Sequence, residues 1–205
     1  MSRNELKDVE AALNHDLNNT LQVVMGNLEV LRRRAAFVPE VVDAALNATR
    51  SAAHLADRMA AVARLRNVEP RRLDLNVALD DLGDMMRRTL GEAIRVVLEP
   101  SPHAGAVLMD PRCLQTALLE LAANARAAMP AGGKLTVRSS KARLDIIDTG
   151  AGMAAEKIAR AFDGTDAAAL GLYLVERCLS ACGGRVEIAA TPERGTTITL
   201  HLPPA

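Results

Sequence analysis

The chain has 205 residues, and its 25 Lys and Arg residues balance 25 Asp and Glu residues, so the formal net charge is zero. This balance argues against a nucleic-acid-binding protein that works through a basic surface. Hydrophobic residues make up 49% of the sequence but aromatic residues only 1%, so the core must be aliphatic. The sequence has no apolar run of about 18 residues and no apolar signal core at its N-terminus. We therefore expect a soluble, cytoplasmic protein without membrane insertion.

The three cysteines, Cys113, Cys178 and Cys182, favour a reducing compartment. Their odd number and the lack of a CxxC pair argue against a disulfide framework. Cys178 and Cys182 are four residues apart in a helical run, a spacing that predicts core packing, and no histidine is close enough in sequence to complete an obvious zinc site.

Residues 1–67 are predicted to form two helices. The pattern indicates one helix over residues 4–34 and a second from about 40 to 66, separated by a break that contains Pro39. In both helices apolar residues recur at intervals of three and four, as in helices that pack on other helices. These residues are Leu17, Leu21, Val24, Leu28 and Leu31 in the first helix and Leu46, Ala53, Ala56, Ala60 and Ala63 in the second.

Two long helices with a short connection form an antiparallel hairpin. A single hairpin buries little apolar surface, so we expect two copies to pair as a four-helix bundle and infer a homodimer. No long linker follows near residue 68, so motion in the hairpin can be passed on along the chain.

His15 lies near the start of the first helix, in the sequence LNHDLNN. Asn19 follows four residues later and shares its helix face, and Asp16 is beside both. A neutral imidazole nitrogen, a carboxylate that orients it and an amide that places a water or a phosphoryl oxygen together suit a phosphate acceptor. A solvated surface histidine among polar neighbours is the alternative.

From residue 68 onward, short strands alternate with helices, which predicts an α+β domain with helices on one face of a sheet. We therefore expect two domains, 1–67 and 68–205. The predicted helices cover 77–90, 111–128 and 170–182, and the predicted strands cover 94–98, 134–138, 144–147, 185–189 and 196–202.

Three groups in this second domain predict a nucleotide pocket. Glu120 and Asn124 share a face of the 111–128 helix, where the amide oxygen of Asn124 can bind Mg²⁺ and Glu120 can act as a base or hold a metal-bound water. A polar surface pair on an amphipathic helix is the alternative. Asp148 ends a hydrophobic strand, and its carboxylate can accept a hydrogen bond from an exocyclic amine such as that of adenine. Gly150 and Gly152 follow it and let the backbone approach a ligand closely.

The third group is Gly171, which is predicted to open a helix whose free N–H groups can receive a phosphate. Thr196 lies farther on, in a turn that leads into the last strand.

In this order the motifs resemble the transmitter core of sensor histidine kinases, and the resemblance covers nearly the whole chain. His15, Asp16 and Asn19 resemble the phosphoacceptor box of the dimerization helices. Asn124 with Glu120 resembles the N box, which binds Mg²⁺ in the ATP-binding domain.

Asp148, Gly150 and Gly152 resemble the G1 box, in which the Asp recognises adenine. The sequence NARAAMPAGG at 124–133 is similar to nitrogen-regulation-type and hybrid kinases. The other matches are Phe162 with the F box, Gly171 with the glycine that survives from the G2 box, and Thr196 with the turn before the last strand.

The resemblance implies a helical hairpin that forms a four-helix bundle as a dimer, followed by a two-layer α/β sandwich of the histidine kinase and Hsp90 type. It also implies a protein-histidine kinase that uses ATP and Mg²⁺. His15 would attack the γ-phosphate in line with help from Asp16, and the phosphoryl group would pass to an Asp of a response-regulator receiver domain. Asn19 stands where the family positions a water for dephosphorylating the regulator.

The chain departs from the family between Phe162 and Leu170, where its segment is shorter than the usual ATP lid. Ala167 and Ala169 stand where the G2 box usually has glycines, and each added methyl restricts φ and crowds the path beside the phosphates.

The charges of this region also differ from those expected around a triphosphate. Asp163 and Asp166 would repel the phosphates if they faced them. Arg160 or Arg126 is the expected source of positive charge.

These departures leave a second interpretation, a non-ATPase histidine phosphotransfer protein whose degenerate ATP-binding-like domain docks receiver domains. A third is a regulatory binder that sequesters another factor. Nucleotide binding separates the first two interpretations, and phosphorylation of His15 by a phosphorylated receiver separates the second from the third. Only 14 residues precede His15, so we expect the input from a separate sensor protein, or the chain to be either a piece of a longer one or a stand-alone transmitter.

Overall fold

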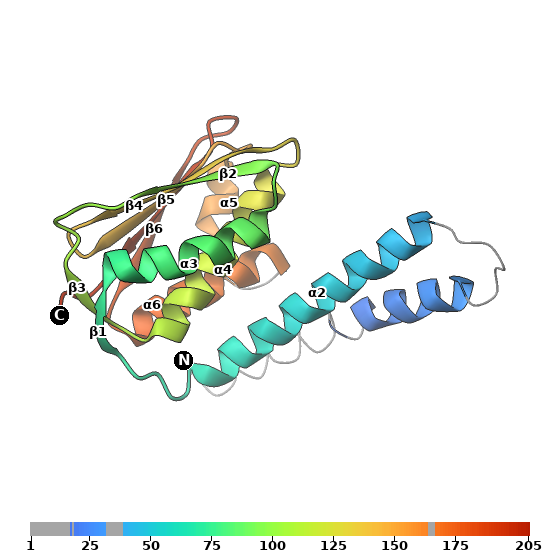
Figure 1. The fold of residues 1–205 in the computed structure, drawn as a ribbon, viewed down its shortest axis with the longest axis horizontal. Helices are drawn as coiled ribbons and strands as arrows, with labels where there is room; N and C mark the ends of the chain where they lie inside the picture. The colour runs from blue at the N-terminus through green and yellow to red at the C-terminus, as the bar shows by residue number, and fades with distance from the viewer. Residues whose placement is uncertain (1–16, 18, 32–38, 164–166) are drawn as a thin grey trace. The chain divides into compact units, whose positions relative to one another are not determined.

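The computed structural model describes residues 17, 19–31, 39–163 and 167–205. The chain divides into two compact units, residues 1–66 and 67–205, whose elements are drawn in Figure 1. His15 and Asp16 lie outside the described residues. In the described ranges, no helix combines the length and the apolar character needed to cross a membrane.

The first unit contains a helix over residues 19–31 and helix α2, Pro39–Arg64, which confirms two helices in this region. The apolar positions that the sequence pattern singled out remain accessible in the single chain: Leu21 and Leu28 are exposed. The predicted stripe on α2 is exposed as well, and α2 buries a different set of side chains. The exposed residues are Leu46, Ala53, Ala56, Ala60 and Ala63, and the buried ones include Ala45, Ala48, Leu55 and Val62.

The second unit is built on a five-stranded sheet with the strand order β2-β4-β5-β7-β6. β2 and β4 are parallel, and the other pairs are antiparallel. A separate two-stranded sheet pairs β1 with β3. The strands are β1 (Arg71–Asp74), β2 (Ile94–Glu99), β3 (Ala106–Met109), β4 (Gly133–Ser140), β5 (Arg143–Asp148), β6 (Arg185–Ala190) and β7 (Thr196–His201).

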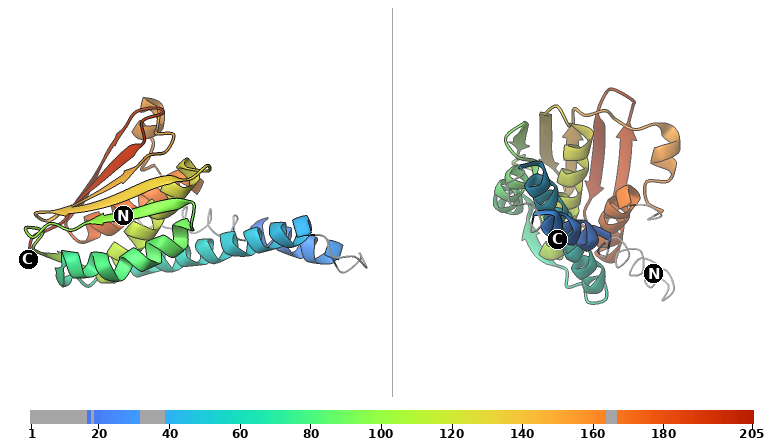
Figure 2. Two further views of the ribbon diagram at one scale, coloured as in Figure 1. Left: turned by 45° about the horizontal axis from the view of Figure 1, so that its top comes forward. Right: turned by 90° about the vertical axis from the view of Figure 1, so that its right-hand side faces the viewer.

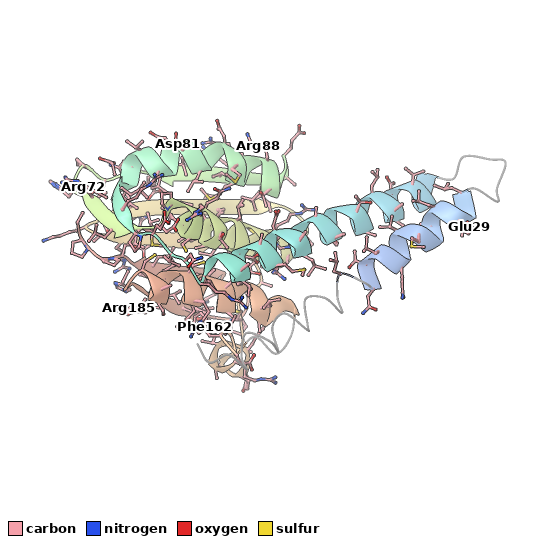
Figure 3. All side chains as sticks on the ribbon, turned by 90° about the horizontal axis from the view of Figure 1, so that it is seen from below. Glu29, Arg72, Asp81, Arg88, Phe162 and Arg185 are labelled. Atoms are coloured by element: carbon pink, nitrogen blue, oxygen red, sulfur yellow. The ribbon has the colours of Figure 1, made fainter. Side chains whose placement is uncertain are left out.

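Three helices cover one face of the larger sheet (Figures 1 and 2): α3 (Leu75–Leu90), α4 (Pro111–Ala128) and α6 (Ala167–Ala181). α4 contacts both α3 and α6 and lies between them when the unit is seen from its helical side (Figure 3). The core between helices and sheet is aliphatic, as the composition required. Its fully buried side chains include Leu79, Met86, Leu114, Leu118, Leu135, Leu144, Leu174 and Leu179.

The predicted helices and the five longer strands are confirmed with small shifts of their ends. Short elements were not predicted: β1, β3 and the five-residue helix α5 (Ala155–Ala159). The prediction that Leu170 and Gly171 open a helix is wrong, because α6 begins at Ala167. Cys178 and Cys182 are buried, which confirms their interpretation as core residues.

Asp110 ties the start of α4 to the segment that enters the second unit. Its carboxylate accepts hydrogen bonds from the backbone N–H groups of Arg112, at 2.9 Å, and Glu69, at 3.0 Å. The Arg112 guanidinium adds an ion pair at 3.1 Å. Burial alone would raise the pKa of Asp110, but these hydrogen bonds and the Arg112 charge outweigh it and hold the pKa below its usual value.

We expect Asp110→Ala to lower the free energy of unfolding at pH 7 by about 1–2 kcal/mol, because α4 loses its N-cap. The folded-state pKa is depressed, so the carboxylate stabilises the fold above its unfolded pKa of about 3.9. That contribution is lost as the pH falls through the lower folded-state pKa. In urea unfolding, the stability difference between native chain and variant should therefore shrink below about pH 4.

Asp84→Ala is the matched control. Asp84 is exposed on α3 and, among the described residues, pairs only with Arg87, three residues farther on, so its loss should cost less than about 0.5 kcal/mol. Equal losses for the two variants, or a difference that does not depend on pH, would contradict the role assigned to Asp110.

Candidate functional site

The second unit contains a cavity of about 600 Å³, a volume typical of small-molecule and cofactor sites. It is bounded by α4, the end of β5 and the loop after it, α5, the start of α6 and β7. Most of its lining is aliphatic. The polar lining residues are Asn124, Asp148, Glu156, Lys157, Arg160, Asp163 and Thr196.

Asp148 is the last residue of β5 and lines the cavity. Its Oδ1 atom accepts hydrogen bonds from the backbone N–H groups of Gly150, at 2.8 Å, and Thr196, at 3.2 Å. The other oxygen, Oδ2, accepts no hydrogen bond from the described residues. The carboxylate is therefore held in one orientation with one oxygen left for a donor on a ligand.

Close backbone contacts explain why glycines surround Asp148. Gly152 has a φ of +68° and Gly195 a φ of +77°, a region that side chains disfavour. A Cβ at Gly152 would collide with the carbonyl oxygen of Thr191, and one at Gly195 would collide with that of Asp148. Gly195 lets the β6–β7 loop lie directly against the end of β5, and Gly152 lets the loop after β5 lie against the β6–β7 loop.

Asn124 projects from α4 into the cavity. Its Nδ2 atom is buried and makes no hydrogen bond with the described residues, whereas buried amides are normally paired. Rotation of the amide exchanges its nitrogen and oxygen, so Asn124 can present either a donor or an acceptor to a ligand. Glu120, one turn earlier on α4, is also buried but does not line the cavity.

The site suits a magnesium ion that arrives with a nucleotide. Mg²⁺ is usually held by one or two protein oxygens together with waters and substrate phosphates. Among the described residues, no group of three or more His, Cys, Asp or Glu side chains is arranged to hold a metal ion. The oxygen of Asn124 is a suitable single protein ligand, with the remaining ligands coming from phosphates and water.

The structure brings together four of the predicted pocket residues: Asn124, Asp148, Gly152 and Thr196 line the cavity. Gly150 lies behind them, packed so closely on Ala128 of α4 that a Cβ would come within 2.7 Å of its carbonyl oxygen.

Phe162 and Gly171 do not line the cavity. Phe162 lies just beyond α5 (Figure 3) and is half-buried, while its neighbours Ala161 and Asp163 do line it. Gly171 is buried within α6, so its N–H group does not belong to the free first turn.

Two residues of the predicted phosphoacceptor group, His15 and Asp16, lie outside the described residues, and Asn19 is an exposed residue of the first unit. Sequence reasoning missed the lining residues Met153, Lys157 and Leu172. Lys157 lies five residues after Gly152. This closeness to the glycine loop is the one sequence feature that could have indicated a place in the pocket.

Residues 109–205 match the family described as histidine kinase-, DNA gyrase B- and HSP90-like ATPase. The chain is 29% identical to the sensor kinase CckA of Brucella abortus (strain 2308) over 92% of its own length. It is 28% identical to the sensor protein DivL of Caulobacter vibrioides over 96%. It spans only 23% and 28% of the lengths of these two relatives.

The histidine kinase AdeS of Acinetobacter baumannii has the same fold, with a TM-score of 0.71 and 20% identity over 92% of this chain and 97% of that one. The mycobacterial sensor histidine kinase MprB has a TM-score of 0.53 and 28% identity over 65% of this chain and 97% of that one. The predicted fold class is thus confirmed. The family match and these relatives confirm the resemblance of the chain to a sensor histidine kinase transmitter core.

Proposed function

We propose that this chain is the core of a two-component histidine kinase that phosphorylates itself on His15 with ATP and passes the phosphoryl group to a response regulator. In this proposal residues 1–67 form the dimerization and phosphoacceptor domain and residues 68–205 the ATP-binding domain, and the protein acts in the cytoplasm. The observation that carries the proposal is the cavity in which the oriented carboxylate of Asp148 and the unpaired amide of Asn124 meet.

Asp148 suits the recognition of adenine. Two backbone N–H groups occupy one of its oxygens, so the other can accept a hydrogen bond from the exocyclic amine. The aliphatic lining, which includes Ile146, Met153 and Leu172, provides apolar contact area for the flat face of a purine.

Asn124 suits the phosphate end of the nucleotide. Its oxygen would hold Mg²⁺, and the ion would neutralise charge on the phosphates. Glu120 lies one turn from Asn124 and would act as a base or orient a metal-bound water, although its carboxylate is set back from the cavity.

His15 is the proposed acceptor. Its imidazole nitrogen forms a bond to the γ-phosphorus while the bond from that phosphorus to the bridging oxygen breaks, and ADP leaves. Asp16 would orient the ring and stabilise the charge it gains. Asn19 would place a water that hydrolyses the phosphorylated regulator. The phosphoryl group then moves from the histidine to an aspartate oxygen of the receiver domain.

Neighbouring structures support ATP and a receiver domain as ligands. ShkA, described as a complex with AMPPNP, has a TM-score of 0.67 over 99% of this chain. The histidine kinase ThkA, described as a complex with the response regulator protein TrrA, has a TM-score of 0.74 over 98% of this chain. At identities of 23% and 16%, these TM-scores establish a common fold alone. The ligands enter as part of the proposal.

The exposed apolar stripes of the helical unit support a homodimer. On the 19–31 helix Leu21, Met25 and Leu28 are exposed and lie on one face by their spacing. Leu46 adds an exposed leucine on α2. Apolar side chains in rows of this kind are typical of a helix that packs against a partner helix, and a second copy of the hairpin would cover them.

Asp148→Asn should raise the dissociation constant for ATP at least about tenfold. The two backbone N–H groups would keep the amide oxygen on their side, so the new amide nitrogen would face the adenine amine, and two donors would oppose each other. Isothermal titration calorimetry measures the effect.

Asp145→Asn is the control for this change. Asp145 lies on the same strand, accepts hydrogen bonds from Thr199 and Arg143 at 2.7 and 2.9 Å and does not line the cavity. Its variant should unfold more easily and bind ATP unchanged. The proposal for Asp148 fails if both variants bind ATP like the native chain.

His15→Ala should abolish incorporation of acid-labile label from γ-labelled ATP and Mg²⁺, because the attacked phosphorus then has no acceptor nitrogen. His103→Ala, which alters an exposed histidine of the second unit, should leave labelling intact. Label that persists in the His15 variant would refute the acceptor assignment. A native chain that neither binds ATP nor takes up label would support the phosphotransfer interpretation instead.

Leu28→Glu should convert the dimer to a monomer in sedimentation velocity, because it places a charge in the proposed seam. Val23→Glu is the matched control: Val23 and Leu28 are both 53% exposed, but Val23 lies about 140° away around the helix. A dimer that survives the Leu28 change would contradict the proposed seam.

A further inference from the structure

A cavity that holds a triphosphate needs positive charge close to the phosphates. The lining of this cavity includes three carboxylates, Asp148, Glu156 and Asp163, and two cations, Lys157 and Arg160. The side chains around the cavity therefore have a net negative charge, so each unpaired cation matters for the binding of an anion.

Both arginines that the sequence suggested as sources of positive charge already have hydrogen-bond partners. Arg160 lines the cavity, but its Nε donates a hydrogen bond to Asp163 at 3.3 Å, so its charge is shared with that carboxylate. Arg126 does not line the cavity, and its Nη1 donates to the carbonyl oxygen of Thr89, at the end of α3, at 3.2 Å.

The segment between α5 and α6 offers no substitute. From Asp163 to Ala169 the sequence reads DGTDAAA and has no Lys or Arg. The next arginine, Arg177, lies within α6 and pairs with Glu176 at 3.8 Å.

Lys157 remains. It lies on α5 and lines the cavity, and its ammonium group forms no ion pair or hydrogen bond with another described residue. Ala161, four residues later, is buried and also lines the cavity, so the side of this segment that carries Lys157 is turned toward it. The long, flexible lysine stem lets the ammonium group reach an anion from the rim.

We infer that Lys157 contacts the phosphate chain of the bound nucleotide and sets the preference of the cavity for ATP over adenosine. The inference deepens the proposed function and rests on it. Lys157 is a binding residue here, since its ammonium would form a charge-assisted hydrogen bond to a phosphate oxygen in a cavity whose other charged side chains sum to a negative charge.

The test is calorimetric titration of the full chain with ATP, ADP and adenosine in the presence of Mg²⁺. Lys157→Ala should raise the dissociation constant for ATP about tenfold in 0.1 M salt, while that for adenosine should change less than about twofold. Lys157→Arg should restore ATP binding to within about threefold. The Lys157→Ala variant should also show a weaker dependence of ATP affinity on salt, because one ionic contact is gone.

Lys141→Ala is the matched control. Lys141 is exposed between β4 and β5 and does not line the cavity, so its variant should bind all three ligands like the native chain.

The outcomes separate this inference from the proposed function. If the native chain binds no nucleotide, both fail. If it binds ATP and Lys157→Ala binds it equally well, the role of Lys157 is wrong while the proposed function stands. If the variant loses ATP and adenosine to the same degree, Lys157 supports α5 and does not read the phosphates, and the inference is overturned.

Discussion

The carboxylate of Asp148 holds together the chain segments on which the cavity depends. Its Oδ1 accepts N–H groups from Gly150 and Thr196, so one atom fixes the end of β5, the glycine loop and the start of β7. Gly195 comes so close to the Asp148 carbonyl that no side chain fits. Because backbone groups orient the carboxylate, its second oxygen keeps its direction without a ligand. The residue that organises the site is thus the one proposed to recognise adenine.

Helix α4 is the second fixed part of the site. Asp110 caps its first turn, Asn124 projects into the cavity from its fourth turn, and Ala128 at its end packs against Gly150. The N–H group of Ala151 donates to the Ala128 carbonyl at 3.1 Å. α4 is therefore anchored at both ends, and the relative positions of Asn124 and Asp148 follow from backbone contacts.

The features that sequence reasoning predicted correctly have strong local signals. α4 has the ends predicted for it, and in the structure it begins with Asp110 as N-cap followed by Pro111, a typical helix start. The strands β1 and β3 were missed, because four residues are too few to show alternation and their pairing joins distant segments. The start of α6 was misplaced, because alanine has the highest helix propensity, so the alanines at 167–169 extend the helix toward the N-terminus.

The same alanines help to explain which cation is available to the cavity, a feature that the sequence alone could not show. Glycines there would favour a loop, whereas the alanines lengthen α6 and leave only residues 164–166 between it and Asp163. A segment this short and without Lys or Arg cannot supply a cation to the cavity. Charge pairing is not readable from sequence, and it is the pairing of Arg160 with Asp163 that leaves Lys157 as the unpaired cation of the lining. The positive charge available to the cavity therefore lies on Lys157 of α5 and not on the segment before α6.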